Sequence, residues 1–449
     1  MSNQRPPRAG GLSALAIAWV LGLGGALGVA DPARDFVPFL AGLLVAGVGW
    51  WGLLRLGPRL SARQVGALLA LGVLARAAAW CFEPDLSRDL DRYVYEGRVA
   101  WWGGLGFPFR VPPSEAPLHG VPPALLDHAW SRINHPEIPT LYPPLAQLVF
   151  VSAGALDQVF GHAAAWLKAL LIVADLGTLW ILFRLHRVAA LGWALAPVAI
   201  LETAKEGHAD VLSALGLALL IVGFTKPRPK LGYLGLALAA LGKLNGLALL
   251  PAALRSWRRD LWPLALLVLV GLPWMLAGPT ALTGLSEYAS RWRAGDGAFS
   301  LLLPIAEALL GGEWRHFGRF TVTQHQLARG LALVLWMGGS AWILRRPAPI
   351  TGIPERAGAL LLLLLLLSPT FHPWYAIWLL PFVASNPRAF GAAAWLLGIA
   401  PLLHLPAHLE ATTGTWTDPH WSRALVHLPA WALWGWSQRG QGDPRQERS

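Results

Sequence analysis

The chain of 449 residues is poor in cysteine and in charge. It contains a single cysteine, Cys81, which excludes an intrachain disulfide framework and a CxxC metal site. Only 14% of the residues are charged, whereas 55% are hydrophobic, and the mean hydropathy is +0.47. Soluble proteins carry about 25% charged residues, so this composition excludes an ordinary soluble domain.

Several catalytic motifs are also missing. The sequence contains no HExxH, no GxxxxGK[ST] and no GxSxG. A zinc peptidase, a P-loop protein and a serine hydrolase therefore have no motif in their favour. No internal repeat of 20–50 residues is evident, which disfavours the transporter folds that are built from repeats.

Long apolar runs recur along the whole chain, from Gly11 to Trp436. A run of about 20 such residues can cross ~30 Å of hydrocarbon. The sequence therefore predicts an all-α polytopic membrane protein in which residues 1–449 form a single integral membrane domain. The clearest predicted spans are 10–30, 36–56, 63–81, 163–186, 209–224, 260–278, 326–345, 356–368 and 423–438. Shorter or interrupted segments raise the expected number to about 11–14 transmembrane or half-spanning helices.

Basic residues predict which loops face the cytoplasm, because positively charged loops stay on that side. Their distribution places a large first loop, 82–141, and a second loop, 279–325, outside. To keep the later basic clusters inside, segment 231–253 must be a hairpin that turns near Lys243. The net charge of +11 is explained by this topology and by contact with anionic membrane lipids, and no nucleic-acid partner is expected.

The most unusual stretch is the polar segment 82–147, which holds eight of the 25 acidic residues. If 89–101 is helical, Asp89, Arg92, Tyr93 and Glu96 share one face. A carboxylate there can accept a proton from a hydroxyl group, and a guanidinium can bind a phosphate. From spacing alone, a solvated surface helix with Asp–Arg pairs is the better interpretation.

Polar residues also interrupt the apolar spans at three later places. Segment 202–210 holds five titratable groups, which are costly at a membrane boundary unless they face water or each other. A functional site and a plain polar loop explain this segment equally well. In segment 368–375, a helix break with interfacial aromatic residues is a simpler explanation of His372 than catalysis. Lys243 lies in apolar surroundings, where a lipid phosphate would compensate its charge.

Metal binding has little support in the sequence. Asp89 and Asp91 form a DxD pattern, which some nucleotide-sugar enzymes use for a divalent cation, but a lone DxD is common. We expect no metal and no cofactor.

Three groups of motifs resemble one enzyme family. They are Ser87–Arg98, Gly106–Phe109 and Asn134–Gln147, followed in matching order by Glu202–Asp210, Lys243–Pro251 and His372–Tyr375. Together they resemble the bacterial polyprenyl-phosphate-mannose-dependent mannosyltransferases of the C-type (GT-C) glycosyltransferase superfamily. These are related to glycosyltransferase family eighty-seven and to the mannosyltransferase of glycolipid-anchor assembly. The resemblance covers about residues 80–380, and 134–147 is its most specific part.

The resemblance implies a GT-C-like bundle whose first extracytoplasmic loop carries short helices and the catalytic site. It implies an inverting transfer of a hexose, with mannose expected, from a polyprenyl-phosphate donor to a glycolipid or glycan acceptor. The protein would then act in the bacterial inner membrane, with its active site facing the periplasm or exterior. Asp89 is the expected general base. The residues expected to bind substrate are Asp91, Arg92, Tyr93, Glu96, Arg98, Tyr142, Glu202, Lys205, His208, Asp210, Lys243, His372 and Tyr375.

Two other classes of protein remain open at this point. A flippase for lipid-linked sugars, or a secondary transporter, would also have many helices, broken spans and a few buried ions. A non-catalytic membrane subunit is the third possibility. Convergence of Asp89, His208 and His372 on one cavity would favour the enzyme over both.

Overall fold

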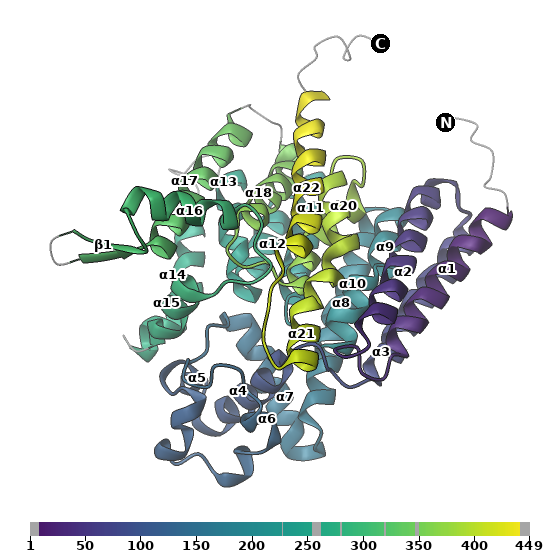
Figure 1. Cartoon of the computed structure of the whole chain (residues 1–449). Helices are drawn as coiled ribbons and strands as arrows, with labels where there is room; N and C mark the ends of the chain where they lie inside the picture. Colours follow the sequence, from purple (N-terminus) through teal and green to yellow (C-terminus); the bar gives the residue numbers. More distant parts are fainter. Residues whose placement is uncertain are drawn as a thin grey trace.

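The computed structural model describes residues 9–226, 228–253, 262–278, 281–317, 320–345 and 350–440. The described residues are 78% helical with almost no sheet, which confirms the prediction of an all-α polytopic membrane protein. Both described chain ends lie at one end of the molecule, and α4–α7 gather at the opposite end (Figure 1).

The N-terminal third forms three long helices and then a region of short ones. The long helices are α1 (Ala9–Leu27), α2 (Phe36–Leu56) and α3 (Ala62–Trp80), with η1 (Gly57–Arg59) after α2. The short elements are α4 (Asp89–Gly103), α5 (Phe107–Arg110), η2 (Pro113–His119), η3 (Pro123–Leu125) and α6 (His128–Ser131). The expected helix over 89–101 is confirmed by α4.

The middle of the chain alternates between complete and broken helices. Its elements are α7 (Pro144–Phe160), α8 (Ala163–Leu185), α9 (Arg187–Ala194), α10 (Pro197–Ala199), the π-helical η4 (Ile200–Lys205), α11 (Val211–Thr225), α12 (Pro229–Gly242), η5 (Leu244–Leu249) and α13 (Leu250–Ala253). The chain turns at Lys243, and η5 folds back on α12 so closely that a Cβ on Gly246 would lie 2.3 Å from the Ala240 nitrogen. This is the hairpin that the charge distribution requires.

The C-terminal part contains a small hairpin and further broken helices. The elements up to residue 344 are α14 (Trp262–Ala277), α15 (Leu282–Arg291), α16 (Phe299–Leu310), β1 (Trp314–Phe317), β2 (Phe320–Thr323) and α17 (Gln324–Leu344). The two strands pair antiparallel. The remaining elements are η7 (Ile350–Gly352), α18 (Ile353–Leu367), η8 (Pro373–Leu379), α19 (Leu380–Ser385), α20 (Gly391–Ile399), η9 (Ala400–His404), α21 (Leu405–Thr413) and α22 (His420–Gly440).

Among the described residues, six helical segments are long and apolar enough to cross a membrane, and two bent pairs raise that number to eight. Shorter apolar helices, such as α7 and α11, account for further predicted spans. The predicted span 260–278 corresponds to α14 only from Trp262, because 254–261 lie outside the described residues.

A proline and a buried ion pair explain the 55° bend between α9 and α10. Pro197 has no N–H to donate, so carbonyl groups of the preceding turn need another donor. The Arg76 guanidinium donates to the carbonyl oxygens of Trp193 (3.2 Å) and Ala194 (2.6 Å), and it pairs with the buried Asp175. The break lets the chain continue as η4, which carries Glu202 and Lys205.

The segment 82–141 has a small hydrophobic core of its own, separate from that of the helical bundle. It contains Tyr95, Val99, Phe107, Val111, Ala116, Val121, Leu125 and Ile133. Segment 82–141 is attached to the bundle through α4 and α7. A Cβ on Gly97 would lie 2.1 Å from the Phe150 carbonyl oxygen, so these helices touch backbone to backbone.

Candidate functional site

A cavity of 1130 Å³ lies between segment 82–141 and the broken helices of the bundle. It is larger than the usual 300–1000 Å³ of a site for one small ligand. Of the residues singled out in the sequence, the cavity is lined by Asp89, Arg92, Tyr142, Lys243, His372 and Tyr375. Other lining residues are Ala33, Trp416 and residues from 85–88, 132–141, 287–295, 371–374 and 403–411.

Asp89 stands at the start of α4, half-buried in the cavity wall. Its backbone N–H donates to the Ser87 hydroxyl at 3.1 Å, and the Tyr93 hydroxyl donates to its Oδ2 atom at 3.2 Å. Tyr93 is itself fixed by its ring, which stacks on Phe150 at 4.5 Å and meets Tyr142 edge-on at 4.8 Å. A carboxylate in the first turn is also favoured by the helix dipole. Asp89 is thus a positioned, partly hydrated carboxylate.

Arg92 and Glu96 lie on the same face of α4 as Asp89, but their hydrogen bonds go mainly to the loop 134–140. Arg92 donates to the carbonyl oxygens of Asn134, His135 and Ile138 at 2.8–3.1 Å and contacts Glu96 at 3.3 Å. The Glu96 carboxylate accepts hydrogen bonds from Thr140 and Gln147, each at 2.7 Å. Burial raises the pKa of Glu96. Because these contacts occupy most of the Arg92 donors, its expected role in phosphate binding stays a prediction.

Asp91 and Arg98 are not among the cavity-lining residues. Asp91 pairs with Arg132 at 3.1 Å, and Arg98 pairs with Asp127 and with Asp157. Burial raises the pKa of Asp91. Both residues stabilise contacts of segment 82–141, and Asp91 therefore serves below as a matched control for Asp89.

Segment 202–210 is buried and its charges are largely paired. Lys205 contacts Asp85 and also Glu206, at 2.7 Å from Glu206. Of these residues only Asp85 reaches the cavity. Burial, and next the nearby Glu206, raise the pKa of Asp85 from its ordinary value of 3.8 to about 6. Lys205 therefore joins the bundle to the start of segment 82–141.

Lys243 lies where α12 ends. Its Nζ atom is 3.3 Å from Asp210 Oδ2 and lies 5.2 Å and 5.4 Å from the ring centroids of Tyr142 and Tyr375. Trp378 donates to the other oxygen of Asp210 at 2.8 Å. These contacts hold an ammonium group between aromatic faces without surrounding it.

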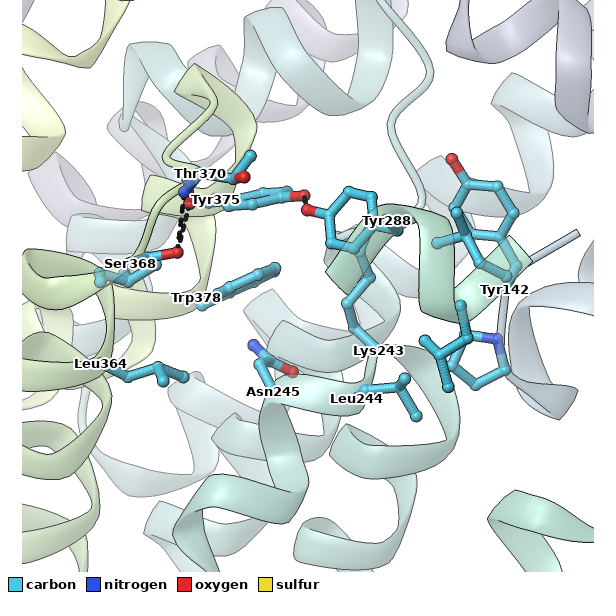
Figure 2. A pocket seen from close by; sticks show the side chains of 14 residues that line it. Tyr142, Lys243, Leu244, Asn245, Tyr288, Leu364, Ser368, Thr370, Tyr375 and Trp378 are labelled. Carbon is cyan, nitrogen blue, oxygen red and sulfur yellow. Dashed lines mark hydrogen bonds between the residues drawn. The ribbon is translucent and has the colours of Figure 1, made fainter. Parts of the chain in front are cut away.

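A second, smaller pocket of 190 Å³ adjoins the cavity (Figure 2). The two spaces share Leu141, Tyr142, Lys243, Tyr288 and Tyr375. The Tyr288 and Tyr375 hydroxyl groups lie 2.6 Å apart. Beyond this shared wall, the pocket is lined mainly by apolar side chains, among them Leu244, Leu285, Leu364, Leu365 and Trp378.

A cluster of histidines forms another wall. The Trp374 ring stacks on His208 at 3.9 Å and on His372 at 4.5 Å. His372 lines the cavity, whereas His208 is fully buried behind Trp374. Of the three residues expected to converge on one cavity, Asp89 and His372 therefore do so, whereas His208 lies behind Trp374 and pairs with Glu202.

The sequence reasoning did not single out Trp292, Tyr288 or His404, all of which line the cavity. Tyr288 and Trp292 belong to the predicted second loop, 279–325, and nothing in their spacing marks them. His404 carried a usable signal, because it is a titratable residue between two prolines inside a long apolar stretch.

Comparisons with protein-family models, curated proteins and solved structures give no match for this chain. Within the described part of the chain, no group of three or more His, Cys, Asp or Glu side chains is arranged to hold a metal ion.

Proposed function

We propose that the protein is an inverting glycosyltransferase that moves a hexose from a polyprenyl-phosphate donor to a hydroxyl group of a glycolipid or glycan. Mannose is the sugar expected from the resemblance. The observation that carries the proposal is the position of Lys243. It lies between a polar cavity that holds a carboxylate and a pocket with mainly apolar walls. A polyprenyl-phosphate sugar fits this arrangement, with its sugar in the polar cavity, its phosphate at Lys243 and the start of its lipid in the apolar pocket.

Asp89 acts as the general base. Its Oδ2 atom accepts a hydrogen bond from Tyr93, which leaves Oδ1 for the acceptor hydroxyl. Asp89 takes the hydroxyl proton as the acceptor oxygen bonds to the anomeric carbon of the donor. The bond between that carbon and the phosphate oxygen breaks on the opposite face, its electron pair leaves with the phosphate, and the configuration inverts.

Lys243 stabilises the charge that develops on the leaving phosphate. The ammonium group lies in the wall common to both spaces, and Asp210 and two aromatic rings fix its position. A cation that is already in place when charge develops lowers the barrier without further reorganisation. The apolar pocket is suited to the first carbons of the lipid, since a cavity of about 150 Å³ holds a group the size of benzene.

The first test is transfer of radiolabelled mannose from synthetic polyprenyl-phosphate-mannose into lipid extracts. We expect transfer by wild-type membranes and a loss of about 10²- to 10⁴-fold in D89N, the range typical of a general base. D91N is the matched control, because Asp91 is two residues away on the same helix and does not line the cavity.

Each other outcome has a defined meaning. Equal transfer by D89N and wild type would remove Asp89 as the base. Absence of transfer by wild type, with polyprenyl-phosphate-mannose moving between the leaflets of reconstituted vesicles, would favour a flippase. Equal losses in D89N and D91N would indicate damage to α4 or to the cavity wall, which includes Arg132, the partner of Asp91.

A further inference from the structure

The Glu202 carboxylate is completely buried and faces two imidazoles. Its Oε1 atom lies 2.8 Å from His404 Nε2, and its Oε2 atom lies 3.1 Å from His208 Nδ1. Lys205, three residues further along η4, is occupied by Asp85 and Glu206. Among the described residues, the two imidazoles are therefore the ionic partners of Glu202.

This arrangement favours one positive charge on the imidazole pair. A buried carboxylate that is ionised is costly unless a cation compensates it. With one imidazole nitrogen at each carboxylate oxygen, a single imidazolium gives a charge-assisted hydrogen bond and a neutral cluster. Glu202 thus retains a proton on a histidine next to the cavity.

His404 is the member of this pair that borders the cavity. His404 makes the shorter contact, which has hydrogen-bond geometry, and it lines the cavity. His208 is fully buried against Trp374, and its contact with Glu202 lies off the line of a hydrogen bond.

His404 borders the cavity, although its side chain is only 2% exposed. Its neighbours along this wall include Leu403, Pro406, Ala407 and Ala411, which carry no charge, and the exposed Glu410. Across from this wall, Trp374 lies 6.4 Å away, ring centroid to ring centroid. Five arginines, Arg88, Arg92, Arg132, Arg291 and Arg293, line other parts of the cavity.

We propose that the positively charged imidazole pair held by the positioning residue Glu202 binds phosphate in the cavity through His404, in addition to Lys243. The ligand is a phosphate monoester or diester, carried by a lipid or free in solution. The inference rests on the proposed function for its place in the reaction, where two cations would share the charge of the leaving phosphate.

Binding measurements test this site independently of transfer. Dissociation constants of the purified full-length protein are measured by native mass spectrometry for polyprenyl monophosphate, for polyprenol without phosphate, and for inorganic phosphate. The variants are H404Q, E202Q and E202D. H408Q is the matched control, because His408 contacts the Ala33 carbonyl oxygen and stacks on Phe36 without lining the cavity.

We expect H404Q to bind polyprenyl monophosphate about 10- to 100-fold more weakly, as for loss of a hydrogen bond to a charged group. E202Q should show a similar loss, E202D should recover most of the affinity, and H408Q should match wild type. Binding of polyprenol should not change, which shows that the variants fold. Weakening confined to inorganic phosphate would identify a free phosphate as the ligand and would still support the site.

Three results would overturn the inference. They are unchanged phosphate binding by H404Q, equal weakening toward polyprenol and polyprenyl monophosphate, and no phosphate binding by wild type. The transfer assay remains the separate test of the proposed function. Loss of transfer in D89N together with unchanged phosphate binding in H404Q would reject His404 and leave the glycosyltransferase intact.

Discussion

The ionisation of Asp85, a residue of the cavity wall, should make the stability of the protein depend on pH. The pKa of Asp85 is raised to about 6, chiefly by burial. The folded protein therefore holds this proton at pH values where the unfolded chain has released it. The resulting stabilisation is fully present below about pH 3.8 and is lost as the pH rises through about 6.

The D85N variant should remove this pH dependence. Between pH 4 and pH 7, the melting temperature of wild type should fall more than that of D85N, measured on purified protein in detergent. E115Q is the control, because the Glu115 side chain is 55% exposed in the same segment. Parallel curves for wild type and D85N would show that Asp85 does not titrate in this range.

Single residues were predictable where their charge contrasts with the surrounding sequence. Lys243 and His372 stand out from apolar neighbours, whereas Asp89 was singled out through the family resemblance, and all three line the cavity. The partner of Glu202 was not predictable, because His404 lies 202 residues further along the chain. Local spacing also could not separate Asp89 from Asp91. Their side chains leave α4 in different directions, and the difference depends on where α4 meets the bundle.

The α4–α7 contact positions the carboxylate, and it depends on small residues. At Gly97 an added methyl group would overlap the carbonyl group of Phe150. We expect G97A to lose about 1–3 kcal/mol of stability, as in overpacked cores, because helix backbone must move to make room. Transfer should fall as well, because α4 carries Asp89.

Thermal unfolding and the transfer assay, applied to G97A and G66A, test this expectation. Gly66 lies within α3 and has open space where a Cβ would stand. G66A should therefore be as stable as wild type or slightly more stable, since alanine favours a helix. If G97A behaves like G66A, then α4 and α7 are not in backbone contact.

Complete helices were easier to predict than broken ones. The spans 36–56 and 163–186 correspond closely to α2 and α8 because unbroken apolar runs define them. The π-helical η4 and the turn after Lys243 depend on tertiary contacts, such as the Arg76 hydrogen bonds, that hydropathy does not encode.

On the scale of the whole molecule, the charge distribution predicts that segment 82–141 lies outside the cytoplasm. We expect L118C to react with a membrane-impermeant maleimide in intact spheroplasts, and A62C to react only after the membrane is opened. Both variants are made in a C81S background, and both positions are exposed in the structure. The opposite labelling pattern would invert the topology and contradict an extracytoplasmic site.

The fold class followed from composition, because a chain of this hydropathy can satisfy its backbone in a bilayer only as helices or a closed barrel. The shape of the cavity could not be predicted from composition. Its walls come from segments about 300 residues apart in the chain. No periodicity within one segment indicates which distant segment will face it.

The wall shared by the cavity and the apolar pocket also affects how much free energy is needed to bind a lipid substrate. Moving a hydrocarbon chain from a bilayer into water costs about 0.8 kcal/mol per methylene, so a chain of 25 carbons would require ~20 kcal/mol. That approaches the strongest non-covalent binding known. The donor avoids this free-energy cost if its phosphate contacts Lys243 while most of its tail remains in the bilayer. The protein would then have to recognise only the few atoms next to the bond that breaks, and lipids of different length could serve equally well.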